Sequence, residues 1–161
     1  MKYILDANIF IRSKNDMPFD IWLSFWDKMK TLINSGNVFS CNQIKAEIEK
    51  GKDDLTKWLI NNAPKNFFIN ENKEIIEQYQ ITQNWAQSQK YRLKPSALED
   101  FAIVADAYLV ATAKAYNYTL VTYEKSNPNS KSRILIPDVC VALDVRYCDL
   151  NTMLRELKIT I

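Results

Sequence analysis

Short apolar runs alternate with longer segments of helical pattern along the chain. The apolar runs are typical of short buried strands, and they lie at residues 2–5, 38–41, 67–69, 118–122 and 133–136. The helical patterns cover residues 19–34, 42–50, 54–61, 72–91, 95–116 and 149–156. Strands that alternate with helices favour an α/β fold with a mainly parallel sheet. A length of 161 residues predicts one domain that spans residues 1–161.

Capping and breaking residues mark several of these boundaries. Gly36 follows a helical pattern and is expected to end it, because glycine readily adopts the backbone conformation found after a helix. Asn42 is a candidate N-cap of the first helix that follows, and Asp53 or Asp54 is a candidate N-cap of the second. The pattern over residues 95–116 is long and allows a break before Asp106.

The composition excludes several kinds of site. The chain has no histidine, which excludes Ser-His and Cys-His nucleophilic catalysis and His-based zinc sites. Its two glycines are too few for a Walker loop or a GxGxxG nucleotide fingerprint. The three cysteines have no CxxC spacing and are expected to be reduced thiols. Carboxylates, hydroxyls, amides, lysines and arginines therefore remain for any chemistry.

The charge balance permits a nucleic-acid partner without requiring one. The formal net charge is +2, and a site built from several acids leaves the rest of the surface more basic, as a phosphate backbone requires. No apolar run approaches the ~20 residues of a membrane span, and no basic-then-apolar leader opens the chain. We therefore expect a cytosolic (cytoplasmic) protein without a membrane partner.

Three acids follow predicted strands. Asp6 comes directly after the first apolar run, Glu124 follows the run at residues 118–122, and Asp138 repeats the pattern more weakly. In open α/β folds, ligands bind outside the carboxyl ends of the strands. Each acid also has a simpler interpretation: Asp6 as a turn residue, Glu124 as part of a solvated loop, and Asp138 as the cap of a short helix.

Two further acids lie on helical patterns. Glu47 lies at the edge of the apolar stripe of residues 42–50, where its carboxylate could also reach water. Asp106 shares an apolar face with Leu109 and Val110, and burial of an isolated carboxylate is costly unless it is paired, hydrogen-bonded or metal-bound. The alternative is that Asp106 caps a helix beginning there.

These acids are expected to converge, because strand ends and helix starts meet along one edge of a parallel sheet. Three or four neighbouring carboxylates cannot all stay ionised without a cation. Oxygen ligands without histidine or cysteine select Mg²⁺ or Mn²⁺ over zinc. Such ions activate water and stabilise the charge that develops when a phosphodiester is attacked.

Four segments resemble the motifs of the PIN-domain nucleases in order and spacing: Ile4–Asn8, Ile44–Ile48, Ala105–Ala113 and Leu120–Glu124. The Trp22–Trp26 helix and the segment Ile136–Cys140 resemble a PIN-like branch described mainly as a domain of unknown function and related to VapC-type toxins. The resemblance implies a three-layer α/β/α fold with Mg²⁺- or Mn²⁺-dependent endoribonuclease activity. It also implies a toxin with an antitoxin encoded alongside, and it is compatible with a homodimer.

The resemblance assigns roles to particular residues. Asp6, Glu47 and Asp106 match the core metal-binding acids of the family. Asn8 matches a small polar position two residues after the first acid, and Thr122 matches a hydroxyl before the fourth acid. Both are expected to orient the acids or a water around the metal.

The fourth acid departs from the family pattern. Glu124 stands where the common pattern has aspartate, and the usual second acid shortly after it is missing, so either Glu124 or Asp138 could complete the site. Glutamate reaches one methylene further, so Glu124 could act directly or through water. The loop after Glu124 carries three cations that could contact RNA phosphates or simply be solvated: Lys125, Lys131 and Arg133. Four tyrosines could stack on unpaired bases or pack within the protein: Tyr91, Tyr116, Tyr118 and Tyr123.

Two other functions compete with the nuclease. The departure at Glu124 gives some weight to a catalytically silent PIN-like module that binds RNA or a protein without cutting. A haloacid-dehalogenase-like phosphatase also begins with an acid after the first strand, but it needs a second acid where this chain has Asn8. The metal-dependent endoribonuclease is the function that the sequence favours.

Overall fold

The computed structural model describes residues 1–161 as nine helices and five strands. Their order is β1 (Tyr3–Leu5), α1 (Ala7–Asp16), α2 (Leu23–Ile33), β2 (Val38–Cys41), α3 (Asn42–Glu49), α4 (Asp54–Asn62), β3 (Phe68–Ile69), α5 (Lys73–Ser88), α6 (Pro95–Ile103), α7 (Asp106–Tyr116), β4 (Thr119–Val121), α8 (Ile136–Ala142), β5 (Tyr147–Cys148) and α9 (Leu150–Glu156). No helix is both long enough and apolar enough to span a membrane.

The five strands form one sheet in the order β3-β2-β1-β4-β5, and every neighbouring pair is parallel. Tyr3 of β1 lies opposite Val38 of β2 on one side and Thr119 of β4 on the other. From β1 the chain first builds outward to β2 and β3, and it later returns to add β4 and β5 on the opposite side. The point between β1 and β4, where the direction of building reverses, is where open α/β sheets bind ligands.

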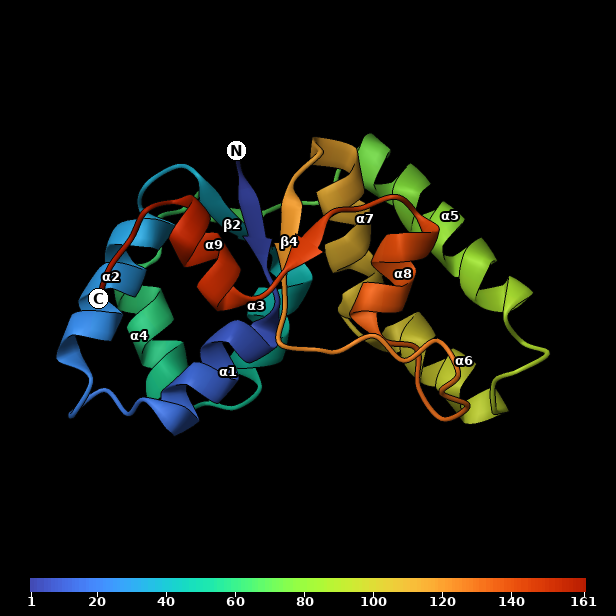
Figure 1. The fold of residues 1–161 in the computed structure, drawn as a ribbon, viewed down its shortest axis with the longest axis horizontal. Helices are drawn as coiled ribbons and strands as arrows, with labels where there is room; N and C mark the ends of the chain where they lie inside the picture. Colours follow the sequence, from blue (N-terminus) through green and yellow to red (C-terminus); the bar gives the residue numbers. More distant parts are fainter.

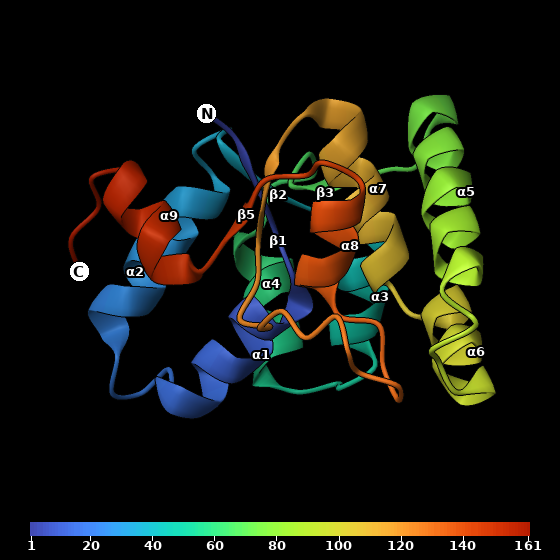
Figure 2. The ribbon, with the colours of Figure 1, turned by 45° about the vertical axis from the view of Figure 1, so that its right-hand side comes forward.

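Helices cover both faces of the sheet, so the fold has three layers (Figures 1 and 2). In Figure 1, α1, α2, α4 and α9 lie on the left of the strands, and α5, α6, α7 and α8 lie on the right. The α/β/α architecture predicted from the sequence is confirmed. Both faces of a parallel sheet must be covered because its strands are apolar on both sides, and all three residues of β1 and of β4 are buried.

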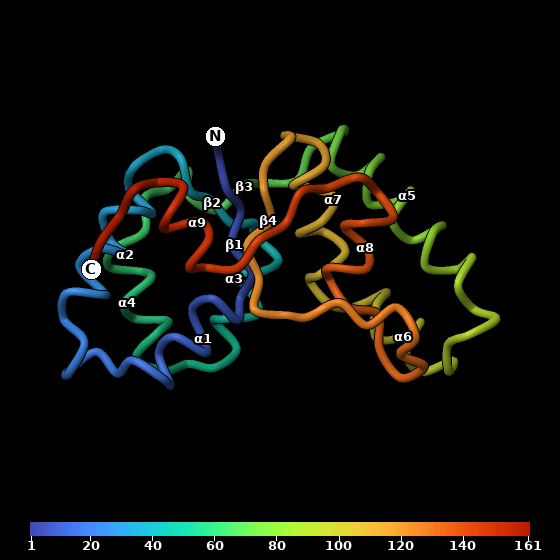
Figure 3. The backbone as a smooth tube through the Cα atoms, in the orientation of Figure 1, coloured from blue at the N-terminus to red at the C-terminus, as the bar shows by residue number.

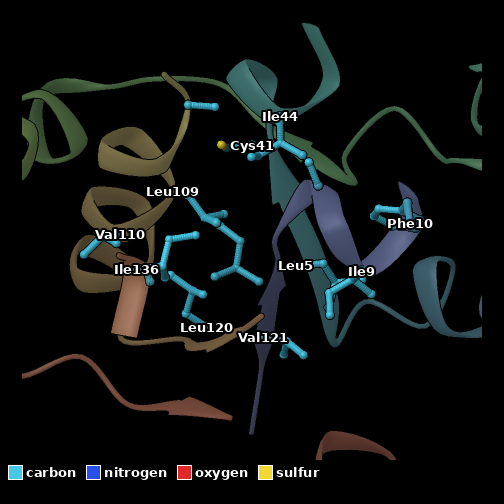
Figure 4. Close-up of a cluster of buried hydrophobic side chains, with 14 of the residues drawn as sticks. Leu5, Ile9, Phe10, Cys41, Ile44, Leu109, Val110, Leu120, Val121 and Ile136 are labelled. Atoms are coloured by element: carbon cyan, nitrogen blue, oxygen red, sulfur yellow. The ribbon is translucent and has the colours of Figure 1, made fainter. Parts of the chain in front are cut away.

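The core gathers 37 buried apolar residues from both sides of the sheet. Figure 4 shows Leu5 and Val121 of the two central strands with Ile9 of α1 and Leu109 of α7, and all four are fully buried. Burial of such a side chain contributes roughly 1.5–3 kcal/mol. This packing fixes the carboxyl ends of β1 and β4 between two helical layers.

The last helix joins the start of the first strand. The hydroxyl of Tyr3 donates a hydrogen bond to Glu156 Oε2 of α9 at 2.6 Å, and Arg146 pairs with the same carboxylate. Figure 3 shows the chain end leaving α9 beside α2, on the face opposite α7. These contacts lie at the amino ends of the strands, away from the strand ends that carry the predicted acids.

Three predicted boundaries are confirmed, but the predicted N-cap at Asn42 is wrong: Asn42 is the first residue of α3, and Cys41 occupies the N-cap position without a capping side-chain hydrogen bond. Asp53 accepts a hydrogen bond from the Thr56 amide at 3.3 Å and caps α4. Gly36 follows α2 with φ of +75°, a conformation that glycine adopts without strain. The long pattern over residues 95–116 is two helices, and the break falls at Val104 and Ala105, before Asp106 begins α7.

Three elements differ from the sequence prediction. Helix α1 was not predicted. Its buried face includes a serine, which interrupts the apolar periodicity that would indicate a helix; the buried residues are Ala7, Ile9, Phe10 and Ser13. The predicted strand at residues 133–136 is wrong: α8 begins at Ile136, and Pro137 suits its first turn. Strand β5 was not predicted, because it has only two residues, neither is fully buried, and no apolar run indicates a strand there.

Candidate active site

The predicted acids come from four elements that meet at the carboxyl edge of the sheet. Asp6 directly follows β1, and Glu124 follows β4 by three residues. Asp106 is the first residue of α7, and Glu47 lies on α3, which begins directly after β2. The site therefore lies where β1 and β4 diverge, the reversal point of the sheet.

Thr122 links the first and fourth acids. Its hydroxyl donates to Asp6 Oδ2 at 2.9 Å and accepts a hydrogen bond from the Glu124 amide at 3.1 Å. Asp6 is 3% exposed and Thr122 is 2% exposed. Asp6 also occupies the N-cap position of α1, but its side chain makes no capping hydrogen bond. The Asp6 carboxylate is therefore buried and oriented by Thr122, and it does not cap α1.

Asp106 is held at the site by the break between α6 and α7. Val104 has an extended backbone, so a new helix starts at Asp106 and points its first turn at the strand ends. The Asp106 side chain is 15% exposed, and its Oδ2 lies 4.0 Å from Arg133 Nη2. The alternative that Asp106 is a capping residue is not borne out, because Ala105 is the N-cap and no side chain caps α7.

Both carboxylate oxygens of Glu124 have partners. Oε1 accepts from Arg133 Nη2, and Oε2 accepts from the Ile136 amide at 2.8 Å. The Ile136 amide belongs to the first turn of α8, where backbone N–H groups have no partner within the helix. Glu124 thus joins the end of β4 to the start of α8, and its side chain is only 8% exposed.

The acids perturb one another. Burial raises the pKa of Asp6 from 3.8 to about 6; the Thr122 hydrogen bond opposes this, and the charges of Glu124 and Glu47 add to it. Burial, followed by the charges of Asp6, Glu124 and Glu47, raises the pKa of Asp106 to about 7. Like charges shift a pKa in this way only at short range. The four side chains therefore form one electrostatic cluster, called the acid cluster below.

Glu47 is the most open member of the acid cluster. The residue as a whole is exposed, although its carboxylate is crowded enough that partial burial raises its pKa. The positive charges of Lys50 and Arg133 oppose that rise. Lys50 is a site residue that the sequence analysis missed, and its spacing of one helical turn from Glu47 could have revealed it.

The acid cluster is not arranged as a finished metal site. No group of three or more aspartate, glutamate, cysteine or histidine side chains is placed as ligands around one point. The donor set still fits a hard divalent ion, since all four members are carboxylates. Closing them around an ion requires side-chain movement, above all by Glu124, whose oxygens are held by Arg133 and Ile136.

Two depressions flank Asp106. One, of about 220 Å³, is lined by Asp106 and Arg133 together with Phe101. The other, of about 390 Å³, is lined by Glu47 and Lys50 with the α6–α7 junction. A further cavity of about 410 Å³ lies between α3, α4 and β3, and no member of the acid cluster lines it. Of these three cavities, only the two beside Asp106 adjoin the acid cluster.

Other predicted site residues lie outside the acid cluster. Asn8 is exposed on the first turn of α1 and makes no side-chain hydrogen bond. Asp138 accepts from the Ser126 hydroxyl at 2.5 Å and from the Asn127 amide at 3.0 Å. It therefore anchors the loop after Glu124, and it lines a separate depression with Trp85. Of the two candidates for the fourth acid, only Glu124 adjoins Asp6 and Asp106.

The cations and tyrosines that the sequence predicts to contact RNA lie in different parts of the structure. Lys125 and Lys131 are exposed, and Arg133 faces the acid cluster. Tyr123 lies beside the site, where the Arg12 guanidinium stacks 4.8 Å from its ring centroid. Tyr116 and Tyr118 pack against each other before the start of β4, at the opposite edge of the sheet.

Comparison with protein families agrees with the extent of this fold. The model of a family described as "Domain of unknown function (DUF4411)" matches residues 3–161. The chain belongs to this family. No curated protein matches the chain by sequence.

Solved structures similar to this DUF4411 chain share its fold. The crystal structure of VapBC2 from Rickettsia felis, bound to a DNA fragment from their promoter, matches with a TM-score of 0.56 and 16% identity over 92% of this chain and 98% of that chain. The structure of VapBC-1 from nontypeable Haemophilus influenzae matches with a TM-score of 0.53 and 17% identity, and the same shares of both chains are covered. At these identities the likeness shows a PIN-like fold.

Proposed function

We propose that this DUF4411 chain is a metal-dependent endoribonuclease that hydrolyses RNA phosphodiester bonds. One observation carries the proposal: Asp6 and Asp106 are buried beside further acids at the reversal point of the sheet, and their pKa values are raised to about 6 and about 7. Buried like charges are costly, and perturbed acids in a depression are characteristic of functional sites.

Asp6, Glu47, Asp106 and Glu124 are the residues that would hold Mg²⁺ or Mn²⁺. All are oxygen donors, and the chain has no histidine that would favour zinc. A bound ion of this kind lowers the pKa of a water and stabilises charge on the attacked phosphate.

The chain's own groups orient the reaction. The Thr122 hydroxyl fixes Asp6 Oδ2 in place. Asp106 begins α7 close to Asp6 and would hold the ion together with it. The water oxygen bonds to phosphorus as one P–O bond of the RNA breaks; the attacking water releases a proton to solvent, and the departing oxygen takes a proton from solvent. Lys125 and Lys131 are exposed in the loop after Glu124 and would contact neighbouring phosphates.

The proposal includes the toxin role implied by the resemblance to VapC-type proteins. An antitoxin then covers part of the surface, and the chain exposes three consecutive apolar residues before and at the start of α2. Ile21 is 71% exposed, Trp22 48% and Leu23 65%. A contiguous exposed apolar patch of this kind is common at protein interfaces. Expression of the wild type, but not of Asp106→Asn, should arrest growth of a bacterial host.

The nuclease is tested by incubating the purified chain with single-stranded and structured RNA in Mg²⁺ or Mn²⁺. Cleavage is expected to disappear with EDTA and in Asp106→Asn, and to persist in Asp27→Asn, which makes the same chemical change at an exposed site on α2. Cleavage that survives both EDTA and Asp106→Asn would show that the acid cluster does not perform it.

A second function, an RNA- or protein-binding module without catalysis, is favoured by the contacts of Glu124. Both of its oxygens are occupied by Arg133 and Ile136, and no three acids are arranged as ligands. A silent module should show no thermal stabilisation by Mn²⁺, whereas the nuclease should be stabilised in the wild type and not in Asp106→Asn.

A further inference from the structure

One nitrogen atom of Arg133 lies between two members of the acid cluster. Its Nη2 binds Glu124 Oε1 and lies 4.0 Å from Asp106 Oδ2. The two acids are 8% and 15% exposed, whereas the Arg133 side chain is 57% exposed. The guanidinium therefore reaches inward from an exposed loop position to an acid pair that is mostly buried.

Arg133 contacts the one oxygen of Glu124 that a metal could bind without breaking the hydrogen bond from the Ile136 backbone amide. Oε2 of Glu124 accepts from the Ile136 amide at 2.8 Å and holds the start of α8. Oε1 is the remaining oxygen, and Arg133 occupies it. A divalent ion that binds Glu124 directly must therefore compete with Arg133 for the same atom.

Arg133 also acts on the other acids at a distance. Its positive charge lowers the pKa of both Asp106 and Glu47, against the effect of burial. No lysine and no other arginine forms an ion pair with Asp106 or Glu124. Arg133 is thus the cation that pairs with Asp106 and Glu124, while Lys50 also acts on Glu47.

We propose that Arg133 is a built-in competitor for the metal, which pairs with Glu124 and Asp106 in the metal-free protein and leaves both when a divalent ion binds. This inference rests on the proposed metal site. It predicts an effect opposite to that of an ordinary supporting residue: removal of the arginine should tighten metal binding, because the ion no longer has to displace a cation.

The test is Mn²⁺ binding, measured by titration calorimetry at pH 7.5 without RNA. Arg133→Gln should bind Mn²⁺ about three- to fivefold more tightly than the wild type, the range expected for a competing ion pair that is partly solvated. Lys131→Gln is the matched control: it removes the same charge two residues away, at an exposed side chain with no ion pair. Its affinity should change less than twofold, because salt screens exposed charges.

A second measurement follows Arg133 itself in the unaltered protein. The Nε–Hε resonance of Arg133 in an NMR spectrum should shift on titration with Mg²⁺ and saturate with the same affinity as metal binding. If the wild type binds Mn²⁺ but Arg133→Gln binds equally or less tightly, the competitor role is wrong while the metal site stands. If neither protein binds Mn²⁺, the metal site fails, and the inference fails with it.

Discussion

Replacement of Asp106 by asparagine is expected to stabilise the metal-free protein at high pH. The two side chains have nearly the same shape, but asparagine cannot ionise. Burial, and then the charges of Asp6 and its neighbours, raise the pKa of Asp106 from 3.8 to about 7. The Asp106 side chain is only 15% exposed, so solvent only weakly screens the unfavourable free energy of its ionised form.

The sign and size follow from proton linkage. The unfolded chain loses the Asp106 proton near the ordinary pKa, whereas the folded chain keeps it until about pH 7. The folded state binds more protons over this interval, so the free energy of unfolding falls as the pH rises. The difference between 3.8 and about 7 corresponds to ~4 kcal/mol at most. Because Asp6 and Asp106 titrate as a coupled pair, we expect the ionised Asp106 to lower the free energy of unfolding by ~2 kcal/mol.

The assay is urea denaturation followed by circular dichroism, in EDTA, at pH 4.5 and pH 8. Asp106→Asn should match the wild type within ~0.5 kcal/mol at pH 4.5 and exceed its stability by ~2 kcal/mol at pH 8. Asp27→Asn, an exposed control, should follow the wild type at both values. If Asp106→Asn is no more stable than the wild type at pH 8, the claim that the ionised Asp106 carboxylate destabilises the metal-free protein is refuted.

Three further predictions concern the surroundings of the acid cluster. Thr122→Val removes the hydroxyl between Asp6 and the Glu124 amide, so urea denaturation should show a loss of ~1–2 kcal/mol that Thr122→Ser largely avoids. Asp138→Asn should destabilise the loop by ~1 kcal/mol and leave the Mn²⁺ affinity from calorimetry within twofold; a tenfold loss would instead place Asp138 in the metal site. Lys131→Gln should reduce the salt dependence of single-stranded RNA binding to the metal-free protein by ~0.7 in log–log slope, and an unchanged slope would exclude Lys131 from the RNA surface.

The sequence was sufficient to predict the edge of the sheet that carries the acids. Asp6 and Glu124 each follow an apolar run, and the rule that parallel strands end at one edge brings them together without knowledge of the loops. The alternation of strands and helices likewise predicted an α/β fold with a parallel sheet, and the resemblance to PIN-domain proteins predicted its three layers. Asp106 was recognisable because an acid on an apolar face is costly, wherever its helix begins.

The contacts that connect distant loops could not be predicted in the same way. Nothing in the order of residues shows that Arg133 turns inward to Glu124 while Lys131, two residues earlier, stays exposed. The run at residues 133–136 predicts a strand because buried loop and helix residues can produce the same apolar pattern. Ile134 and Ile136 are buried, but Ile136 begins α8 and no strand forms here. Such cases are decided by tertiary packing and not by local pattern.

The central claim is that Asp6, Glu47, Asp106 and Glu124 form one divalent-ion site, and titration of Mn²⁺ into the metal-free protein tests it most directly. We predict saturable binding to the wild type, weakened more than tenfold in Asp6→Asn and in Asp106→Asn and essentially unchanged in Asp138→Asn. An absence of binding to the wild type, or equal binding to all four proteins, would contradict it.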